Sequence, residues 1–130
     1  MKPRILLVED DEFISTLVET VLINSGFEVE IVDRFEAMGS LDPFNFDAVM
    51  TDFQLPGANG CDVIEYARRR SPKIAALIVS GHGDSILDTV ASRGLTNVHV
   101  LNKPFHLDQL LSKIGSLLPS CRIEGEGCSV

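Results

Sequence analysis

Acidic and basic side chains stand at the ends of apolar stretches of this chain. Glu9 and Asp10 follow one such stretch, Asp52 closes a second, and Lys103 comes shortly after a third. If these stretches are neighbouring parallel strands, their carboxyl ends meet at one edge of a sheet, where open α/β sheets hold ligands. A single Asp after a strand is more often a cap of the next turn, but three such strands favour a shared site.

The chemistry of such a site follows from its charges. Two carboxylates about 4 Å apart repel by roughly 4 kcal/mol in a partly screened environment. A cluster of Glu9, Asp10 and Asp52 must therefore bind a proton, pair with Lys103 or hold a cation. A hard divalent ion such as Mg2+ prefers oxygen ligands, so these residues indicate a magnesium site.

The elements that must position these groups alternate between strand and helix. Short apolar runs bounded by turn residues predict strands, and apolar residues at helical spacing predict the helices between them. Five such units predict a single-domain α/β fold, a (βα)5 doubly wound parallel sheet of five strands with right-handed crossovers and helices on both faces. The predicted strands cover residues 5–8, 29–32, 48–52, 74–79 and 98–101.

The predicted helices differ in their apolar character. The first is expected to face the core, with Asp10 or Asp11 as N-cap and Gly26 as its end, and the second is short. The third spans about residues 61–70, the fourth is weakly amphipathic, which indicates a mobile element, and the fifth has a clean apolar stripe. The apolar positions of the first are Phe13, Ile14, Leu17, Val18, Val21 and Leu22.

The composition limits the classes of function. A chain of 130 residues has the usual size of one domain. Its formal net charge of -8 argues against direct nucleic-acid binding, and the run Arg68–Arg70 is interpreted as a solvated helix end. Three cysteines without CxxC spacing indicate neither a disulfide framework nor a zinc site. No signal peptide or membrane-spanning stretch is visible, so a cytoplasmic protein without membrane contact is expected.

Residues 1–118 are predicted to form the domain. Residues 119–130 are polar and rich in Gly, so they are predicted to be a flexible C-terminal tail or the start of a linker.

Taken together, these residues resemble the receiver domain of bacterial two-component response regulators, of the chemotaxis-regulator-like kind. Each motif alone is weak, but five in the family's order and spacing form a strong signal. The resemblance implies a flavodoxin-like strand order of 2-1-3-4-5 and a cis peptide bond before Pro104. The matching elements lie within residues 4–118 and are Glu9-Asp10, Asp52, the loop 55–60, Ser80 and Lys103-Pro104-Phe105.

The resemblance implies a regulatory phosphoacceptor rather than an enzyme. Asp52 would accept a phosphoryl group from the phosphohistidine of a sensor histidine kinase or a phosphotransfer protein, in a Mg2+-dependent reaction. Asp10 and Asp52 would bind Mg2+ directly, Glu9 through water, and Gln54 through its backbone carbonyl. The signal would then pass to a downstream protein or to an output domain.

Two further residues would bind phosphoryl oxygens, Lys103 through its amine and Ser80 through its hydroxyl. An isolated Lys after a strand is usually just exposed, but Pro104 fixes the backbone beside Lys103 and favours a function. Ser80 could equally cap a turn or a helix before Gly81, and only its register with the family favours a role in the site.

Positions beside the phosphoryl group are expected to tune its lifetime. Gln54 and His82 would flank it and control the approach of a hydrolytic water, and Gly81 would leave that approach open. The family often has Tyr or Phe at the switch position, where this chain has Val100. Val100 is therefore expected to be a packing residue, and Val100→Ala to cost roughly 1 to 3 kcal/mol of stability.

Rival functions fit the residues less well. The acidic run after the first strand would repel a dinucleotide pyrophosphate and likewise argues against a flavodoxin-like electron carrier. Gln54 stands where a haloacid-dehalogenase-type phosphatase would need a second Asp. His82 and His99 share no metal-ligand spacing and are interpreted as structural or solvent-facing. A non-phosphorylated interaction module with the receiver fold stays open as the alternative, although Asp52 and Lys103 favour phosphotransfer.

Overall fold

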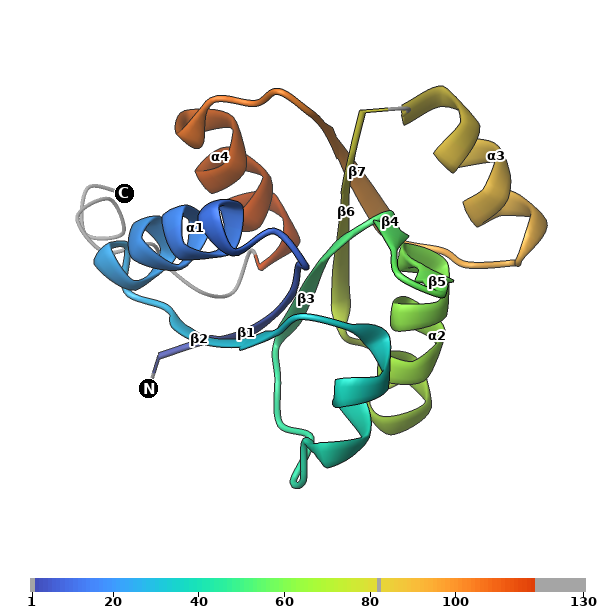
Figure 1. The fold of residues 1–130 in the computed structure, drawn as a ribbon, viewed down its shortest axis with the longest axis horizontal. Coiled ribbons are helices and arrows are strands. Elements are labelled where there is room, and N and C mark those ends of the chain that lie inside the picture. Colours follow the sequence, from blue (N-terminus) through green and yellow to red (C-terminus); the bar gives the residue numbers. More distant parts are fainter. Residues whose placement is uncertain (1, 82, 119–130) are drawn as a thin grey trace.

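The computed structural model describes residues 2–81 and 83–118. Strands and helices alternate along the chain, and a small hairpin follows the third strand (Figure 1). The elements are β1 (Arg4–Val8), α1 (Glu12–Asn24), β2 (Glu28–Val32), the 3-10 helix η1 (Phe35–Ser40), β3 (Ala48–Asp52), β4 (Gln54–Leu55), β5 (Ala58–Asn59), α2 (Gly60–Arg70), β6 (Ala75–Ser80), α3 (Gly83–Ser92), β7 (Val98–Asn102) and α4 (Leu107–Leu117).

Five of the strands form one parallel sheet in the order β2-β1-β3-β6-β7. Counted along the chain without the hairpin, this is the order 2-1-3-4-5. Val8 pairs with Thr51, and Asp52 pairs with Val79, so the carboxyl ends of β1, β3 and β6 lie level with one another. The predicted fold class and strand order are confirmed.

Helices cover both faces of the sheet. On one face, α1 and α4 bury Val18, Leu22, Leu110 and Ile114 against alternate strand residues. On the other face lie α2, α3 and η1, which contacts the core through the fully buried Met38 (Figure 1). Both faces are covered, so the inner strands β1, β3 and β6 are almost entirely buried, as expected for a parallel sheet.

Two expectations about helix surfaces were wrong. Phe13 and Leu17 do not face the core, because 77% of Phe13 and 43% of Leu17 are exposed. The apolar arc of α1 is wider than the face that packs on the sheet, so its outer part stays in solvent. Within the run Arg68–Arg70, Arg69 and Arg70 are exposed at the end of α2 as expected, but Arg68 is not solvated. Its guanidinium donates hydrogen bonds to backbone carbonyls of Ile74, Thr96 and Asn97.

The short second helix is a 3-10 helix, and the bond between Lys103 and Pro104 is cis, as the resemblance implied. The predicted tail at residues 119–130 lies outside the described residues. Within the described part of the chain, none of the helices combines the length and the apolar character that crossing a bilayer requires.

Candidate functional site

The carboxyl edge of the sheet gathers three carboxylates. Glu9 and Asp10 follow β1, and Asp52 is the last residue of the adjacent strand β3. Carboxylate oxygens of these three residues all lie within 4.8 Å of one another. Parallel pairing alone therefore converts two acidic segments far apart in sequence into one cluster.

Lys103 directly follows the edge strand β7, and its side chain reaches this cluster. Its Nζ lies 3.4 Å from Oδ1 of Asp52 and 3.8 Å from Oε2 of Glu9. The backbone amide of Lys103 donates a 2.8 Å hydrogen bond to the carbonyl of Ser80, which anchors the segment after β7 to the end of β6. A single amine thus faces two carboxylates that would otherwise repel each other.

Burial makes the cluster electrostatically costly without a cation. Glu9 is only 4% exposed, and its burial raises the pKa of its carboxyl to about 7, although the backbone amide of Asp11 and the Lys103 amine favour the charged form. Burial also raises the pKa of Asp52, against the opposing effect of Lys103. The amine therefore offsets only part of the desolvation cost, and a divalent ion would offset more.

The donor set fits Mg2+. Oxygen ligands that share this ion at 2.0–2.1 Å lie about 3 to 4 Å apart, so oxygens within 4.8 Å of one another need only a small inward movement to bind it. Glu9, Asp10 and Asp52 would supply only oxygen, the ligand that a hard cation prefers. The same residues could instead share a proton or rely on Lys103 alone.

The cap of α1 leaves Asp10 available. Asp11 is the N-cap, and its Oδ1 accepts hydrogen bonds from the backbone amides of Phe13 and Ile14. The side chain of Asp10 is exposed beside Glu9 and Asp52. Of the two acids that the sequence offered for the cap, the structure uses the one that does not belong to the cluster.

Other predicted site residues follow Asp52, or its pairing partner Val79, along the chain. Ser80 ends β6 and is 4% exposed, whereas the Gln54 side chain is exposed on β4. A Cβ added at Gly81 would meet no atom within 4 Å, so this position is open. His82 lies outside the described residues, and its predicted role has no structural counterpart here.

Sequence reasoning identified the loop 55–60 but missed what two of its residues do. A Cβ at Gly60 would lie 3.1 Å from the Asp52 carbonyl oxygen and 3.2 Å from Cγ2 of Thr51, so any larger residue would have to push the end of β3 outward by a few tenths of an ångström. Asn59 caps α2 through its Oδ1, and its backbone amide donates in turn to Asp62. The Asn59-x-x-Asp62 spacing is a capping-box pattern and was the signal that could have revealed this helix start.

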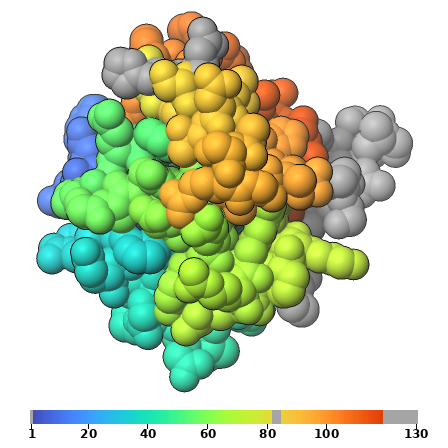
Figure 2. Space-filling model, turned by 90° about the vertical axis from the view of Figure 1, so that its right-hand side faces the viewer, coloured from blue at the N-terminus to red at the C-terminus, as the bar shows by residue number. Residues whose placement is uncertain are grey.

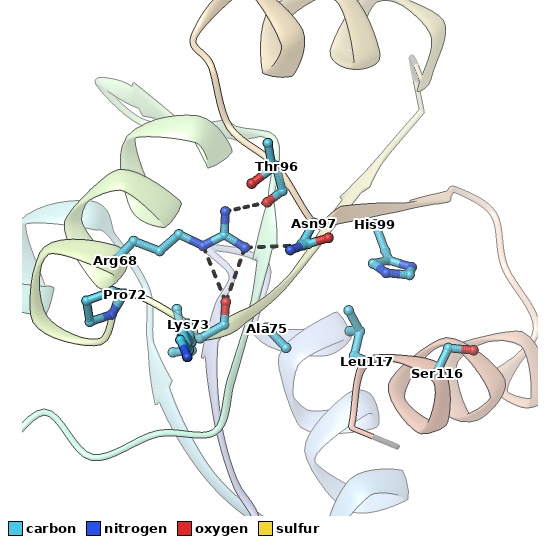
Figure 3. Close-up of a pocket in the computed structure, with 10 residues that line it drawn as sticks. Arg68, Pro72, Lys73, Ala75, Thr96, Asn97, His99, Ser116 and Leu117 are labelled. Atoms are coloured by element: carbon cyan, nitrogen blue, oxygen red, sulfur yellow. Dashed lines mark hydrogen bonds between the residues drawn. The ribbon is translucent and has the colours of Figure 1, made fainter. Parts of the chain in front are cut away.

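The opposite edge of the sheet holds a cavity of about 490 Å³ (Figure 3). Arg68 forms part of its wall, and its N–H groups already bind carbonyls from the segments before β6 and β7. His99 lies on β7 at this edge and is partly buried, away from the carboxylate cluster. The surroundings of His99 fit a structural role for this residue. Arg68 joins the loops before β6 and β7 through its hydrogen bonds.

An apolar groove of about 400 Å³ lies next to Lys103. Its walls come from α1 and from the segment between β7 and α4. Leu17 lines the groove and is partly exposed, and the exposed Phe13 directly precedes Ile14, another lining residue. The surface of α1 at this groove therefore carries exposed large apolar side chains. The groove is lined by Ile14, Leu17, Val18, Lys103, Pro104, Phe105 and Leu107.

Comparisons with known proteins agree with this architecture. The family described as "Response regulator receiver domain" matches residues 5–115. The "Cell cycle response regulator CtrA" of Brucella ovis is 32% identical over 118 residues, which cover 88% of this chain and 50% of that protein. The chain therefore spans about half the length of the curated relatives that it matches.

Solved structures of receiver domains have a similar fold. A response regulator receiver domain protein (CheY-like) from Methanospirillum hungatei superimposes with a TM-score of 0.81 and 26% identity, covering 92% of this chain and 96% of that one. The non-phosphorylated HemR receiver domain from Leptospira biflexa gives a TM-score of 0.79 with 29% identity, covering 93% and 98%.

Proposed function

The chain belongs to the response regulator receiver family, and from that premise we propose that it is a phosphoacceptor of two-component signalling, with Asp52 as the residue that is phosphorylated. Receiver domains are regulatory domains. The observation that carries the proposal is the position of Asp52 beside Glu9, Asp10 and Lys103 at the carboxyl edge of the sheet.

The reaction is a phosphoryl transfer onto a carboxylate. An oxygen of Asp52 forms a bond to phosphorus while the bond from phosphorus to the donor nitrogen of a phosphohistidine breaks, and the leaving imidazole keeps that electron pair. The product is an aspartyl phosphate. Little covalent chemistry is left for the protein in such transfers, so positioning and charge stabilisation dominate.

Each neighbour of Asp52 has a proposed task. Mg2+, when bound, would neutralise charge on the phosphoryl oxygens and on the carboxylates. Asp10 and Asp52 would hold it directly, Glu9 through water and Gln54 through its backbone carbonyl. Lys103 would pair with one phosphoryl oxygen, since its amine already lies 3.4 Å from Asp52.

Ser80 would donate its hydroxyl to another phosphoryl oxygen. The phosphoryl group adds about -1.5 to -2 charges beside it, and that charge can draw the loop after β6 inward. Val100 pairs with Ile78 in the sheet and packs against the core. The movement of the loop after β6 would therefore have to alter the surface without an aromatic ring at position 100.

The proposed phosphodonor is the phosphohistidine of a sensor kinase or a phosphotransfer protein. The apolar groove beside Lys103 and the exposed Phe13 and Leu17 support a protein donor, because a large apolar surface next to a reactive carboxylate favours a protein contact. The signal would pass to a downstream protein or to an output domain, in keeping with the longer relatives.

Intact-mass spectrometry tests the proposal. Incubation with Mg2+ and acetyl phosphate is expected to add one phosphoryl group that is stable in acid and labile in base. Asp52→Asn is expected to abolish the addition, whereas Asp47→Asn, at the amino end of β3, should retain it. An unmodified wild-type protein would favour the non-phosphorylated interaction module instead, and modification of Asp52→Asn would place the phosphoryl group elsewhere.

A further inference from the structure

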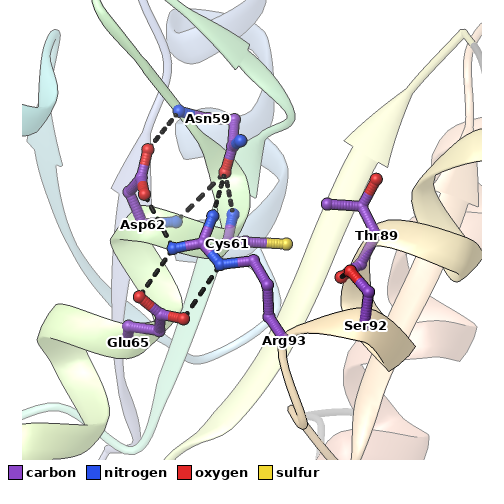
Figure 4. Close-up of polar contacts among 7 residues, drawn as sticks. All are labelled: Asn59, Cys61, Asp62, Glu65, Thr89, Ser92 and Arg93. Carbon is purple, nitrogen blue, oxygen red and sulfur yellow. Dashed lines mark hydrogen bonds and ion pairs between the residues drawn. The ribbon is translucent and has the colours of Figure 1, made fainter.

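A guanidinium joins the end of α3 to the start of α2. Arg93 directly follows α3 and reaches the first turn of α2 (Figure 4). Ile86 and Val90 lie on the apolar side of α3 and are buried in the core. In Figure 2 the yellow and orange surface of α3 and the residues after it meets the green surface of the hairpin and α2.

Arg93 bonds three side chains. Its Nε and Nη2 donate to the two carboxylate oxygens of Glu65 at 2.9 and 2.6 Å. Nη2 also donates to Asp62 at 2.8 Å, and Nη1 donates to Oδ1 of Asn59 at 3.3 Å. Because the Arg93 side chain is only 26% exposed and its bonds to Glu65 are bidentate, this network is stronger than an ordinary surface ion pair.

The network extends to the hairpin after Asp52. Oδ1 of Asn59 accepts from the amides of Cys61 and Asp62 as well as from Arg93, so one oxygen serves both the cap of α2 and the bond to α3. Across the hairpin, Asn59 pairs with Gln54. One residue, Phe53, separates Gln54 from Asp52, and Gln54 is the proposed carbonyl ligand of Mg2+.

α3 is therefore bound at its carboxyl end, through Arg93 and Asn59, to the hairpin that follows Asp52. Its amino end, Gly83, comes three positions after Ser80, the last residue of β6. A movement of α3 must either carry the hairpin with it or break charge-assisted hydrogen bonds to Glu65 and Asp62.

We propose that Arg93 is a positioning residue that fixes the Gln54–Asn59 hairpin relative to α3, and so couples occupancy of the carboxylate cluster to the position of α3. The part that concerns Mg2+ rests on the proposed function, because it uses Gln54 as a ligand. The link between hairpin and helix is independent of that function.

Hydrogen exchange of the metal-free protein tests the link. Arg93→Met is expected to speed amide exchange by about tenfold in both the hairpin, residues 54–59, and α3, residues 83–92, as tenfold corresponds to about 1.4 kcal/mol. Arg93→Lys should give a smaller change, because a lysine keeps the charge but loses the bidentate geometry. Arg69→Met, an exposed arginine on the same helix as Glu65, is the matched control and should leave both segments unchanged.

A Mg2+ titration tests the positioning of the site. Arg93→Met is expected to weaken Mg2+ binding severalfold, with Arg93→Lys in between and Arg69→Met equal to wild type. Faster exchange in α3 alone, or unchanged Mg2+ affinity in a protein that binds the ion, would overturn the proposal. If the wild-type protein bound no Mg2+, the proposed function would fail, and exchange in the metal-free protein would still decide whether Arg93 links the hairpin to α3.

Discussion

The Nζ atom of Lys103 lies 3.4 Å from Oδ1 of Asp52, and no strand pairing joins β3 to β7 directly. β6 separates the two strands, so the Lys103 side chain spans the end of β6 to reach Asp52. The hydrogen bond from the Lys103 amide to the Ser80 carbonyl fixes the backbone from which this side chain extends. The same amine is therefore a structural partner of Asp52 and a ready cation for an incoming phosphoryl group.

Replacing Lys103 should separate metal binding from phosphoryl transfer. In Lys103→Gln the carboxylates lose their cation, so Mg2+ should bind as well as or better than in wild type. Phosphoryl uptake from acetyl phosphate should slow by roughly tenfold to a hundredfold, because one fixed charge aimed at the transferred group is lost. Lys73→Gln, exposed at the opposite edge, is the control. Uptake by Lys103→Gln at the wild-type rate would contradict the role of Lys103.

Mg2+ affinity should depend on Asp10 more than on Glu9. A directly bound carboxylate contributes more than one that acts through water, so Asp10→Asn should weaken binding more than Glu9→Gln does. Bound Mg2+ should also raise the melting temperature, since it binds the folded state. Titration followed by calorimetry measures both effects, and an unchanged affinity in Asp10→Asn would refute the proposed ligand set.

Glu9 should make the metal-free protein less stable as pH rises. Burial raises its pKa from the ordinary 4.5 to about 7, so the folded state binds more protons than the unfolded chain between these values. The free energy of unfolding should therefore fall from about pH 5 to about pH 7, by at most roughly 3 kcal/mol. Denaturant unfolding in the presence of a chelator measures the slope, and Glu9→Gln should remove most of it.

Gln54 and His82 should control how long the phosphoryl group persists. The Gln54 side chain is exposed beside Asp52, so Gln54→Ala should change the dephosphorylation rate severalfold while altering stability by less than about 0.5 kcal/mol. The same result is expected for His82→Ala. Decay of the phosphorylated species by mass spectrometry gives the rates, and Gln109→Ala, an exposed glutamine on α4, serves as the comparison for Gln54. Equal decay in all variants would exclude both positions.

Val100 should behave as a packing residue. It partners Ile78 in the sheet and packs against the core while remaining partly exposed, so Val100→Ala should cost about 1 kcal/mol, the lower end of the range for such truncations. Phosphorylation of the variant should be unchanged. An unaltered melting temperature combined with a change in partner binding only after phosphorylation would identify Val100 as a switch.

The sequence alone was sufficient for the order of strands and helices and for the residues at the strand ends. These features are local: apolar periodicity reports which residues face a core, and Asp52 or Lys103 can be placed by counting from the end of a run. The fold class, the strand order and the membership of the carboxylate cluster followed from these signals together with the family resemblance.

The tertiary structure decided what depends on neighbours distant in sequence. It selected Asp11 rather than Asp10 as the cap of α1, left Phe13 in solvent and gave Arg68 three carbonyls in place of water. It also brought Arg93 to Asn59. Periodicity records only the alternation of buried and exposed positions within one element, whereas the width of a contact face and the partner of a long side chain are set when separate elements pack together.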